Sequence, residues 1–225
     1  MIIFDKVTKK YPFGNIALDE VSFEVADNEF VFLVGPSGAG KTTILKLLLR
    51  EYAPNSGHIT VNDTDISSRT FHSIPHYRQR IGVVFQDFKI LQDKNVFENI
   101  ALSLKITGHD DRYINEEVHK TLELVGLSHK VNMFPSQLSA GELQRIAIAR
   151  AVIGDRDIIL ADEPTGNLDP KTTWEIMRIF KKLEATKTIL FATHNTDIVN
   201  SLKRRVLALK EGKLVKDLRK GGYEV

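Results

Sequence analysis

One segment restricts the possible folds of this chain more than any other: GPSGAGKT, residues 35–42. It stands between FVFLV, which is apolar at every position, and KTTILKLLLR, which has the composition of a helix. A run without polar positions is typical of a strand that a parallel sheet buries on both faces. The spacing matches the phosphate loop G-x-x-x-x-G-K-[ST], which requires such a strand before it and a helix after it. The segment therefore predicts a parallel α/β core that binds a nucleotide.

The residue types of this loop suit a phosphate. Glycines let the backbone wrap around the anion, and the following helix adds the positive end of its dipole. Lys41 would supply a charge for the β- and γ-phosphates, and the Thr42 hydroxyl can bind Mg²⁺. A glycine turn that fits the pattern by chance is the alternative, and the flanking strand and helix count against it. The residues predicted to bind the nucleotide here are Gly35, Pro36, Ser37, Gly38, Ala39, Gly40, Lys41, Thr42 and Thr43.

A pair of carboxylates follows a second buried run. In DIILADEPTGNLD, the apolar stretch 158–161 ends at Asp162 and Glu163, at the carboxyl end of a strand, where α/β sheets bind ligands. Asp162 is predicted to hold Mg²⁺, directly or through water, and Glu163 to polarise the attacking water. Taken alone, such a pair is more often the solvated start of a loop. Its position downstream of a phosphate loop favours the catalytic interpretation.

Three further side chains are weaker candidates, because each stands alone in the sequence. Gln86 ends the strand IGVVFQ and could reach a metal or the attacking water. His194 ends TILFATH, where an imidazole could touch a γ-phosphate. Tyr11 precedes Pro12 in an early loop, and either stacking on adenine or packing beneath that loop would account for it.

The segment SQLSAGELQRIAIARA (136–151) predicts a helix with an exposed, anion-attracting start. Ser139 and Glu142 have the spacing of a capping box, and Leu143 and Ile146 continue at helical spacing. Ala140 and Gly141 leave the amides of the first turn almost without side-chain cover. The segment contains no phosphate loop of its own, so the anion would have to come from elsewhere.

The remaining pattern predicts an α/β chain with two additions to its core. Short strands over 2–11, 21–26 and 57–66, with a turn at Asn62 and Asp63, indicate antiparallel pairing. From about residue 88 to residue 152 the pattern is helical, and strands and helices then alternate. We expect one domain over residues 1–225. Residues 1–87 and 153–225 would form the core with an antiparallel β subdomain, and residues 88–152 an inserted α-helical subdomain.

Composition argues against several classes of function. Lys and Arg number 31 against 29 acidic residues, and a net charge of +2 gives no general case for nucleic-acid binding. The absence of cysteine excludes disulfides and cysteine-ligated metals. No apolar run approaches the roughly 20 residues needed to cross a bilayer. A membrane connection is therefore expected to go through a partner.

Together these segments resemble the nucleotide-binding domain of ATP-binding cassette (ABC) proteins, in the right order and over nearly the full chain. One position departs from the family pattern, since Ala140 replaces the first of the two usual signature glycines, with an effect that the sequence leaves open. The matching positions are Tyr11 (adenine-stacking aromatic), 35–42 (Walker A), Gln86 (Q-loop), LSAGE at 138–142 (signature), IILADE at 158–163 (Walker B), NLD at 167–169 (D-loop) and His194 (switch histidine).

The resemblance implies a P-loop ATPase with a mostly parallel core sheet, in which two copies pair head to tail around two ATP molecules. Ser139 and the Gly141 amide would then contact the γ-phosphate held by the phosphate loop of the other copy. Glu142 and Asp169 join the binding residues by the same resemblance. The implied catalytic residues are Glu163, His194 and Gln86, and the implied Mg²⁺ ligands are Thr42, Gln86 and Asp162.

The stretch DEPTGNLD resembles a branch of the family that includes a cell-division ATPase and lipoprotein-releasing and macrolide-export ATPases. The cell-division type is favoured by three details: the stretch VFQDFKILQDKNVFENIAL (84–102), Glu142 and the ending VKDLRKGGYEV. It implies a membrane protein bound in a groove around residues 86–102, at the cytoplasmic face of the membrane, and an indirect link to peptidoglycan hydrolases. An exporter ATPase is the alternative function. For Phe88, Ile90, Leu91 and Phe97 the alternative is ordinary core packing.

Overall fold

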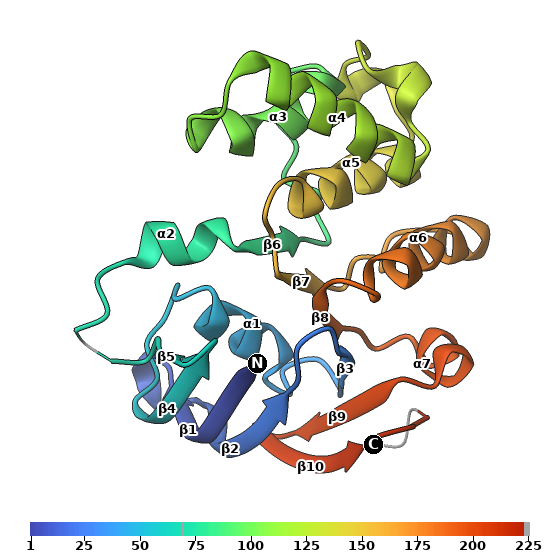
Figure 1. Ribbon diagram of the computed structural model, residues 1–225. Coiled ribbons are helices and arrows are strands. Elements are labelled where there is room, and N and C mark those ends of the chain that lie inside the picture. Colours follow the sequence, from blue (N-terminus) through green and yellow to red (C-terminus); the bar gives the residue numbers. More distant parts are fainter. Residues whose placement is uncertain (69, 223–225) are drawn as a thin grey trace. The chain divides into compact units, whose positions relative to one another are not determined.

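The computed structural model describes residues 1–68 and 70–222 (Figure 1). They form two compact units: unit 1 takes its residues from 1–78 and 187–225, and unit 2 consists of 79–186. The last three residues of the C-terminal tail, 223–225, lie outside the described residues. Among the described helices, none combines the length and the apolar character needed to span a membrane.

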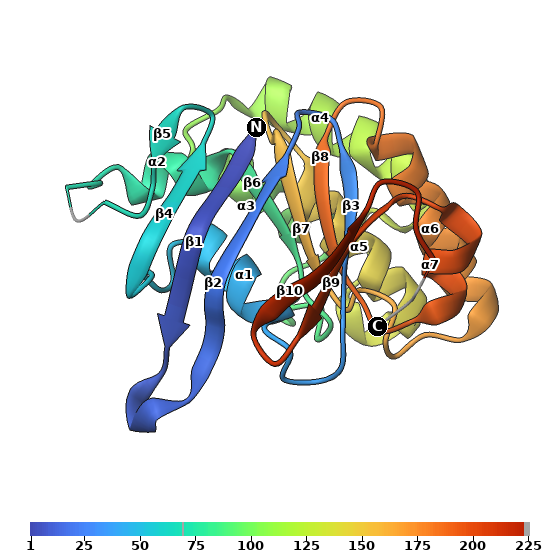
Figure 2. The same ribbon diagram turned by 90° about the horizontal axis from the view of Figure 1, so that it is seen from below.

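The first sheet of unit 1 is antiparallel. Its strands are β1 (Ile2–Lys10), β2 (Ile16–Val25), β4 (Ser56–Val61) and β5 (Thr64–Asp65), in the order β2-β1-β4-β5. Figure 2 shows β1, β2 and β4 side by side. The turn between β4 and β5 has φ values of +46° at Asn62 and +61° at Asp63, the conformation of a tight hairpin turn. The antiparallel pairing expected from the sequence is therefore present.

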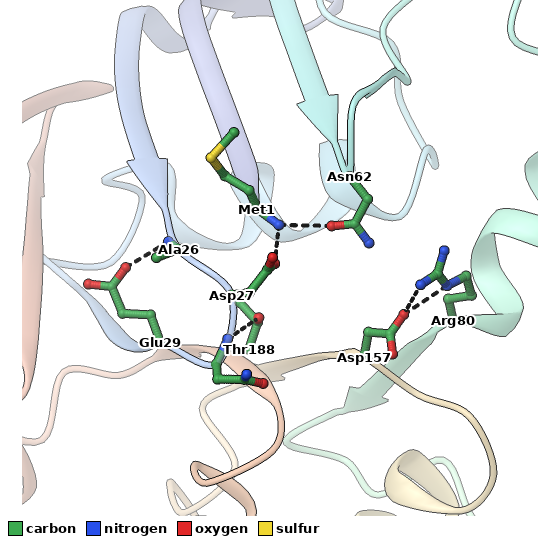
Figure 3. A network of polar contacts seen from close by, with 9 residues as sticks. Met1, Ala26, Asp27, Glu29, Asn62, Arg80, Asp157 and Thr188 are labelled. Carbon is green, nitrogen blue, oxygen red and sulfur yellow. Dashed lines mark hydrogen bonds and ion pairs between the residues drawn. The ribbon is translucent and has the colours of Figure 1, made fainter.

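The amino group of Met1 helps to hold this sheet together (Figure 3). It contacts the carboxylate of Asp27, which follows β2, and lies 2.8 Å from Oδ1 of Asn62 in the hairpin turn. The next residue along, Asn28, donates its backbone N–H to Oγ1 of Thr188 at 3.0 Å. The connection that leaves β2 is thus fixed to both sheets of unit 1.

The second sheet of unit 1 carries the predicted phosphate loop. It contains β3 (Phe30–Val34), β8 (Thr188–Ala192), β9 (Arg205–Lys210) and β10 (Lys213–Leu218), in the order β10-β9-β3-β8. Strand β3 is parallel to β8 and β9, and β9 and β10 form an antiparallel hairpin. Every residue of β3 and β8 is buried, which explains why both are apolar throughout. The helices of this unit include α1 (Lys41–Leu48) and α7 (Thr196–Leu202).

Unit 2 joins a parallel strand pair to a group of helices. The strands are β6 (Ile81–Val84) and β7 (Ile158–Asp162), and a side-chain pair, Arg80 with Asp157, connects the residues just before them (Figure 3). Helices α3 (Val96–Ile106), α4 (Asp111–Val125) and α5 (Ala140–Val152) pack against one another, and α6 (Pro170–Leu183) packs against α5 (Figure 1). A Cβ at Gly82 would lie 1.8 Å from the carbonyl oxygen of Ala151. Only glycine therefore lets α5 approach β6 this closely.

The predicted fold class is confirmed, since strands, helices and parallel pairing occur where the sequence patterns place them. The sequence analysis missed α2 (Ile74–Gln79) and the 3₁₀ turns Pro12–Gly14, Ser128–Lys130 and Pro135–Gln137. Helix α2 has no buried residue and so lacks an apolar stripe. Hydrogen bonds hold it instead: Tyr77 donates its hydroxyl to the carbonyl of Leu48 at 2.6 Å, and Arg78 donates to Leu49 at 2.8 Å. The division of the core at residues 88 and 152 stays a prediction.

Candidate active site

The loop between β3 and α1 is closely packed by its own unit. Gly35, Gly38 and Gly40 have φ values of +148°, +80° and +109°, a region that favours glycine. A Cβ at Gly35 would lie 2.3 Å from the carbonyl oxygen of Leu209, and one at Gly40 would lie 2.7 Å from that of Ala17. The glycines of the sequence motif are thus required by both backbone conformation and space.

Lys41 lies inside this loop rather than in solvent. Its side chain is almost fully buried, and Nζ donates to the carbonyl oxygens of Gly35 at 2.7 Å and Pro36 at 3.2 Å. Thr42 is exposed in the first turn of α1, whereas Thr43 is buried. An ammonium group held beside the loop backbone can interact with a phosphate as a point charge.

Tyr11 adjoins the phosphate loop through its hydroxyl. The Tyr11 OH lies 3.3 Å from Oγ1 of Thr43, and its half-buried ring meets the ring of Tyr52 edge to face. Packing and base stacking are therefore compatible in this residue, because the ring has a protein contact and is also partly exposed.

His194 is located at the same sheet edge as the phosphate loop. Strands β3 and β8 are parallel with Leu33 opposite Ala192, and the N–H of Thr193 donates to the carbonyl of Leu33 at 3.0 Å. The chain then passes through exposed His194 to Asn195, the N-cap of α7. Unit 1 thus brings the predicted switch histidine and the phosphate loop to the ends of neighbouring strands.

Gln86 and Glu163 take equivalent positions in unit 2. Strands β6 and β7 pair in parallel with Val84 opposite Ala161. Gln86 lies two residues after Val84, and Glu163 lies two residues after Ala161. Nε2 of Gln86 donates to Oδ1 of Asn167 at 3.4 Å. The sheet register therefore brings together the Q-loop and Walker B candidates that the sequence places far apart.

Glu163 itself has an unusual backbone conformation. Its φ is +48°, in the left-handed region, which costs a non-glycine residue about 1–3 kcal/mol and persists only where the surrounding structure maintains it. The carbonyl of Glu163 accepts a hydrogen bond from the N–H of Gly166 at 3.1 Å, which closes a tight turn immediately after β7. The carboxylate assigned as base thus projects from a sharply turned strand end, where such strain often accompanies function.

The predicted capping box at the start of α5 is confirmed. The N–H of Ser139 donates to Glu142 Oε2 at 2.9 Å, and the N–H of Glu142 donates to Ser139 Oγ at 3.4 Å. Lys130 adds an ion pair, with Nζ 2.8 Å from Glu142 Oε1. Lys130, followed by the backbone N–H of Ser139, lowers the pKa of Glu142 to about 2. Glu142 is therefore anionic at neutral pH, and its carboxylate oxygens contact the helix cap and Lys130.

The two small residues of the α5 start have different surroundings. Ala140 is exposed, whereas Gly141 is buried, and a Cβ there would lie 2.4 Å from Cγ2 of Thr172 in α6. Unit 2 therefore accommodates the methyl group of Ala140 without displacing a neighbour, but has no space for one at Gly141. Asp169 caps α6 by accepting from the N–H of Thr172 at 3.0 Å, and the Thr172 hydroxyl and N–H lower the pKa of Asp169.

A family model described as ABC transporter matches residues 18–166, more than half of the chain and the segment that holds the phosphate loop, Gln86, the α5 start and Glu163. The chain is a member of the ABC transporter family. It is accordingly an ABC-type ATPase with the P-loop fold of that family.

Curated relatives named cell division ATP-binding protein FtsE match almost end to end. The protein of Bacillus subtilis (strain 168) is 46% identical over 224 residues, covering 99% of this chain and 98% of the relative. That of Streptococcus pneumoniae (serotype 2, strain D39) is 47% identical over 218 residues, covering 96% and 95%. That of Escherichia coli (strain K12) is 41% identical over 215 residues, covering 95% and 97%.

Solved cassettes of the family have the same fold. A dimeric structure of MJ0796, described as a bacterial ABC transporter cassette, aligns with a TM-score of 0.88 at 32% identity, covering 99% of this chain and 100% of that one. A second dimeric structure of MJ0796, in a post-hydrolysis state bound to ADP and Pi, aligns with a TM-score of 0.88 at 31% identity and the same coverage.

The structure of this ABC ATPase also shows supporting residues that sequence reasoning missed. The side chain of Gln144 is fully buried on α5 and donates to the carbonyl of Pro164, just after Walker B, at 2.6 Å. Arg150, near the end of the same helix, donates to the carbonyls of Phe88 at 2.9 Å and Lys89 at 2.6 Å, after the Q-loop glutamine. In the sequence, Gln144 could have been noticed as a polar residue on the buried face of this helix. Nothing in the sequence indicates the contacts that Arg150 makes.

Proposed function

We propose that this chain is the ATP-binding and ATP-hydrolysing subunit of a cell-division complex of the FtsEX kind. Closure of two ATP-loaded copies would drive the membrane protein FtsX and so regulate peptidoglycan hydrolases. The observation that carries the proposal is 41–47% identity to FtsE proteins over 95–99% of the chain. The chain then works at the cytoplasmic face of the cell membrane, held there by FtsX.

In the proposed reaction, each motif residue has one task. The phosphate loop and Lys41 bind the β- and γ-phosphates, and Tyr11 stacks on adenine. Glu163 polarises the water that attacks the γ-phosphate in line, and His194 contacts that phosphate. Support comes from the loop geometry around Lys41, from the shared sheet edge of His194 and the loop, and from the sharp turn that carries Glu163.

The donor groups assigned to Mg²⁺ fit that ion. A hydroxyl (Thr42), a carboxylate (Asp162) and an amide oxygen (Gln86) are the hard oxygen ligands that Mg²⁺ prefers. Gln86 donates through Nε2 to Asn167, so its amide oxygen is the end suited to a cation. When bound, Mg²⁺ neutralises charge on the phosphate oxygens.

The exposed start of α5 is proposed to act on a second copy. Ser139 and the amide of Gly141 would clamp the γ-phosphate that the partner's phosphate loop holds, at the positive end of the helix. The capping box fixes the backbone of this first turn, and the exposed side chain at position 140 is a single methyl group. The dimeric cassettes of MJ0796 support such a pairing.

The segment 86–102 is the proposed docking site for FtsX. Phe88, Ile90 and Phe97 are half-buried and Leu91 is 39% exposed, so none of the four is fully withdrawn into a core. Buried Asn99 fixes the backbone beneath them. Its Oδ1 accepts a hydrogen bond from the N–H of Leu91 at 2.9 Å, and its Nδ2 donates to the carbonyls of residues 91, 94 and 95 at 2.9–3.0 Å. A rigid loop that presents apolar side chains suits a short helix of a membrane protein.

Co-purification with FtsX from the same organism in lipid nanodiscs tests the function. We expect FtsX to bind the chain and to raise its ATPase rate. Leu91→Asp should abolish binding, whereas Val215→Asp, an exposed apolar position on β10, should leave it intact. Binding to the membrane subunit of a lipoprotein or macrolide exporter in place of FtsX would instead establish the exporter alternative.

A further inference from the structure

In unit 1, Tyr11 belongs to a group of aromatic and cationic side chains whose other members no sequence motif predicts. We call Lys9, Tyr11, Lys46 and Tyr52 the aromatic–lysine cluster. The ring centroids of Tyr11 and Tyr52 are 5.4 Å apart and the rings are nearly perpendicular, at 86°. Lys9 Nζ lies 5.1 Å from the Tyr52 centroid and 5.9 Å from that of Tyr11, and Lys46 Nζ lies 5.7 Å from the Tyr52 centroid. These are the geometries of edge-to-face and cation–π attraction.

Contacts to the backbone hold this cluster in place. Lys9 Nζ also donates to the carbonyl of Ala53 at 2.8 Å, so it joins the end of β1 to the segment after α1. In that same segment, the N–H of Asn55 donates to the carbonyl of Thr8 at 2.8 Å. Partial burial of the Lys9 ammonium lowers its pKa, as expected for a cation partly withdrawn from water. The segment that holds Tyr52 is thus anchored to the end of β1, the strand that Tyr11 directly follows.

Tyr11 itself is held at two points. Its hydroxyl lies 3.3 Å from Oγ1 of Thr43, in the first turn of the phosphate-loop helix, and its ring meets Tyr52. A ring that is already fixed loses less conformational entropy when a base stacks on it, and therefore binds more tightly. Tyr52 itself is 37% exposed, so the pair that it forms with Tyr11 lies at the surface of unit 1.

We propose that Tyr52 is a positioning residue for the nucleotide base, because it holds the ring of Tyr11 in the orientation that stacks. This inference rests on the proposed stacking role of Tyr11. Tyr52 then contributes to the affinity that ATP gains from its base, and it does not contribute to the affinity gained from the phosphates. Lys9 faces the rings of both Tyr11 and Tyr52, whereas Lys46 faces the ring of Tyr52.

Binding measurements on the full chain with two probes separate these parts. ATP carries base and phosphates, whereas inorganic tripolyphosphate carries the phosphates alone. Loss of an aromatic pair and of its cation contacts should weaken ATP binding by about 3- to 10-fold in Tyr52→Leu, with tripolyphosphate affinity unchanged. Tyr52→Phe keeps the ring and should restore the affinity for ATP. Tyr113→Leu, which removes a tyrosine stacked on His109 in unit 2, is the matched control.

A double-mutant cycle tests whether Tyr52 acts through Tyr11. Tyr11→Ala should weaken ATP binding more than Tyr52→Leu does, and adding Tyr52→Leu to Tyr11→Ala should cause no further loss. Parental ATP affinity in Tyr52→Leu, equal losses for ATP and tripolyphosphate, or additive losses in the double variant would each overturn the inference. Parental ATP affinity in Tyr11→Ala would refute the stacking role of Tyr11 instead.

Discussion

Replacing Gly141 by alanine would test how tightly the signature helix packs on α6. The new Cβ would lie 2.4 Å from Cγ2 of Thr172, well inside the roughly 3.5–4.0 Å of an ordinary carbon contact. Overpacking of this kind costs about 1–3 kcal/mol, and alanine recovers up to about 1 kcal/mol as the better helix former. Because the two effects oppose each other, the substitution is best measured in two backgrounds that differ only in the clashing methyl group.

Thr172→Ser supplies the second background. It removes Cγ2 and keeps the Oγ1 that donates to Asp169. We expect Gly141→Ala to lower the thermal unfolding midpoint in the parent but to leave it unchanged or raised beside Thr172→Ser. The difference should be about 1–3 kcal/mol, with each kcal/mol worth about 2–4 °C in a chain of this size.

Ala140→Gly is the matched control for this experiment. Residue 140 is exposed at the same helix start, so the change should cost up to about 1 kcal/mol through helix propensity alone, equally in both backgrounds. If Gly141→Ala had the same effect with threonine or serine at position 172, the packing argument would be refuted.

Four further outcomes follow from the site. Lys41→Ala should lose nucleotide binding, and unchanged ATP affinity in equilibrium titration would count against the phosphate-loop assignment. Glu163→Gln should bind ATP and dimerise but hydrolyse it at least about 100-fold more slowly; turnover at the parental rate would exclude it as the base. The pKa of Glu142 is lowered from 4.5 to about 2, so its stabilisation is complete above its ordinary pKa and is lost as the pH falls through about 2. Glu142→Gln should therefore reduce the acid sensitivity of the urea midpoint below about pH 4.5, and an unchanged pH profile would contradict this. Arg150→Met should destabilise the chain by about 2–3 kcal/mol through lost charge-assisted bonds to two carbonyls, with Arg150→Lys recovering part of it; an unaltered urea midpoint would exclude that role.

Much of the fold was predictable because its signals are local. Strand β3 is apolar throughout because both its faces are buried, and the Ser139–Glu142 capping box is specified within four residues of sequence. Helix α2 was missed for the opposite reason. Its stability comes from Tyr77 and Arg78 reaching the end of α1, and hydrogen bonds to a distant backbone leave no periodic pattern.

The same distinction applies to the candidate site. Lys41 and Glu163 could be named from motifs, because their chemistry depends on residue type and local spacing. Tyr52 and Arg150 could not, since each matters through a partner far along the chain: Tyr52 meets Tyr11 across 41 residues, and Arg150 meets Phe88 across 62 residues. Such pairs arise only when the strands and helices have been assembled.

Helix α5 is attached to its own unit at two places along its length, around Gln144 and Arg145 and again at Arg150. Gln144 bonds the turn after Walker B, Arg145 pairs with Glu175 on α6 at 2.9 Å, and Arg150 bonds the backbone at Phe88. Sliding the helix by a single turn, about 5.4 Å, would break all three attachments together. The loop at Phe88 and the helix start at Ser139 are therefore attached to one and the same rigid element.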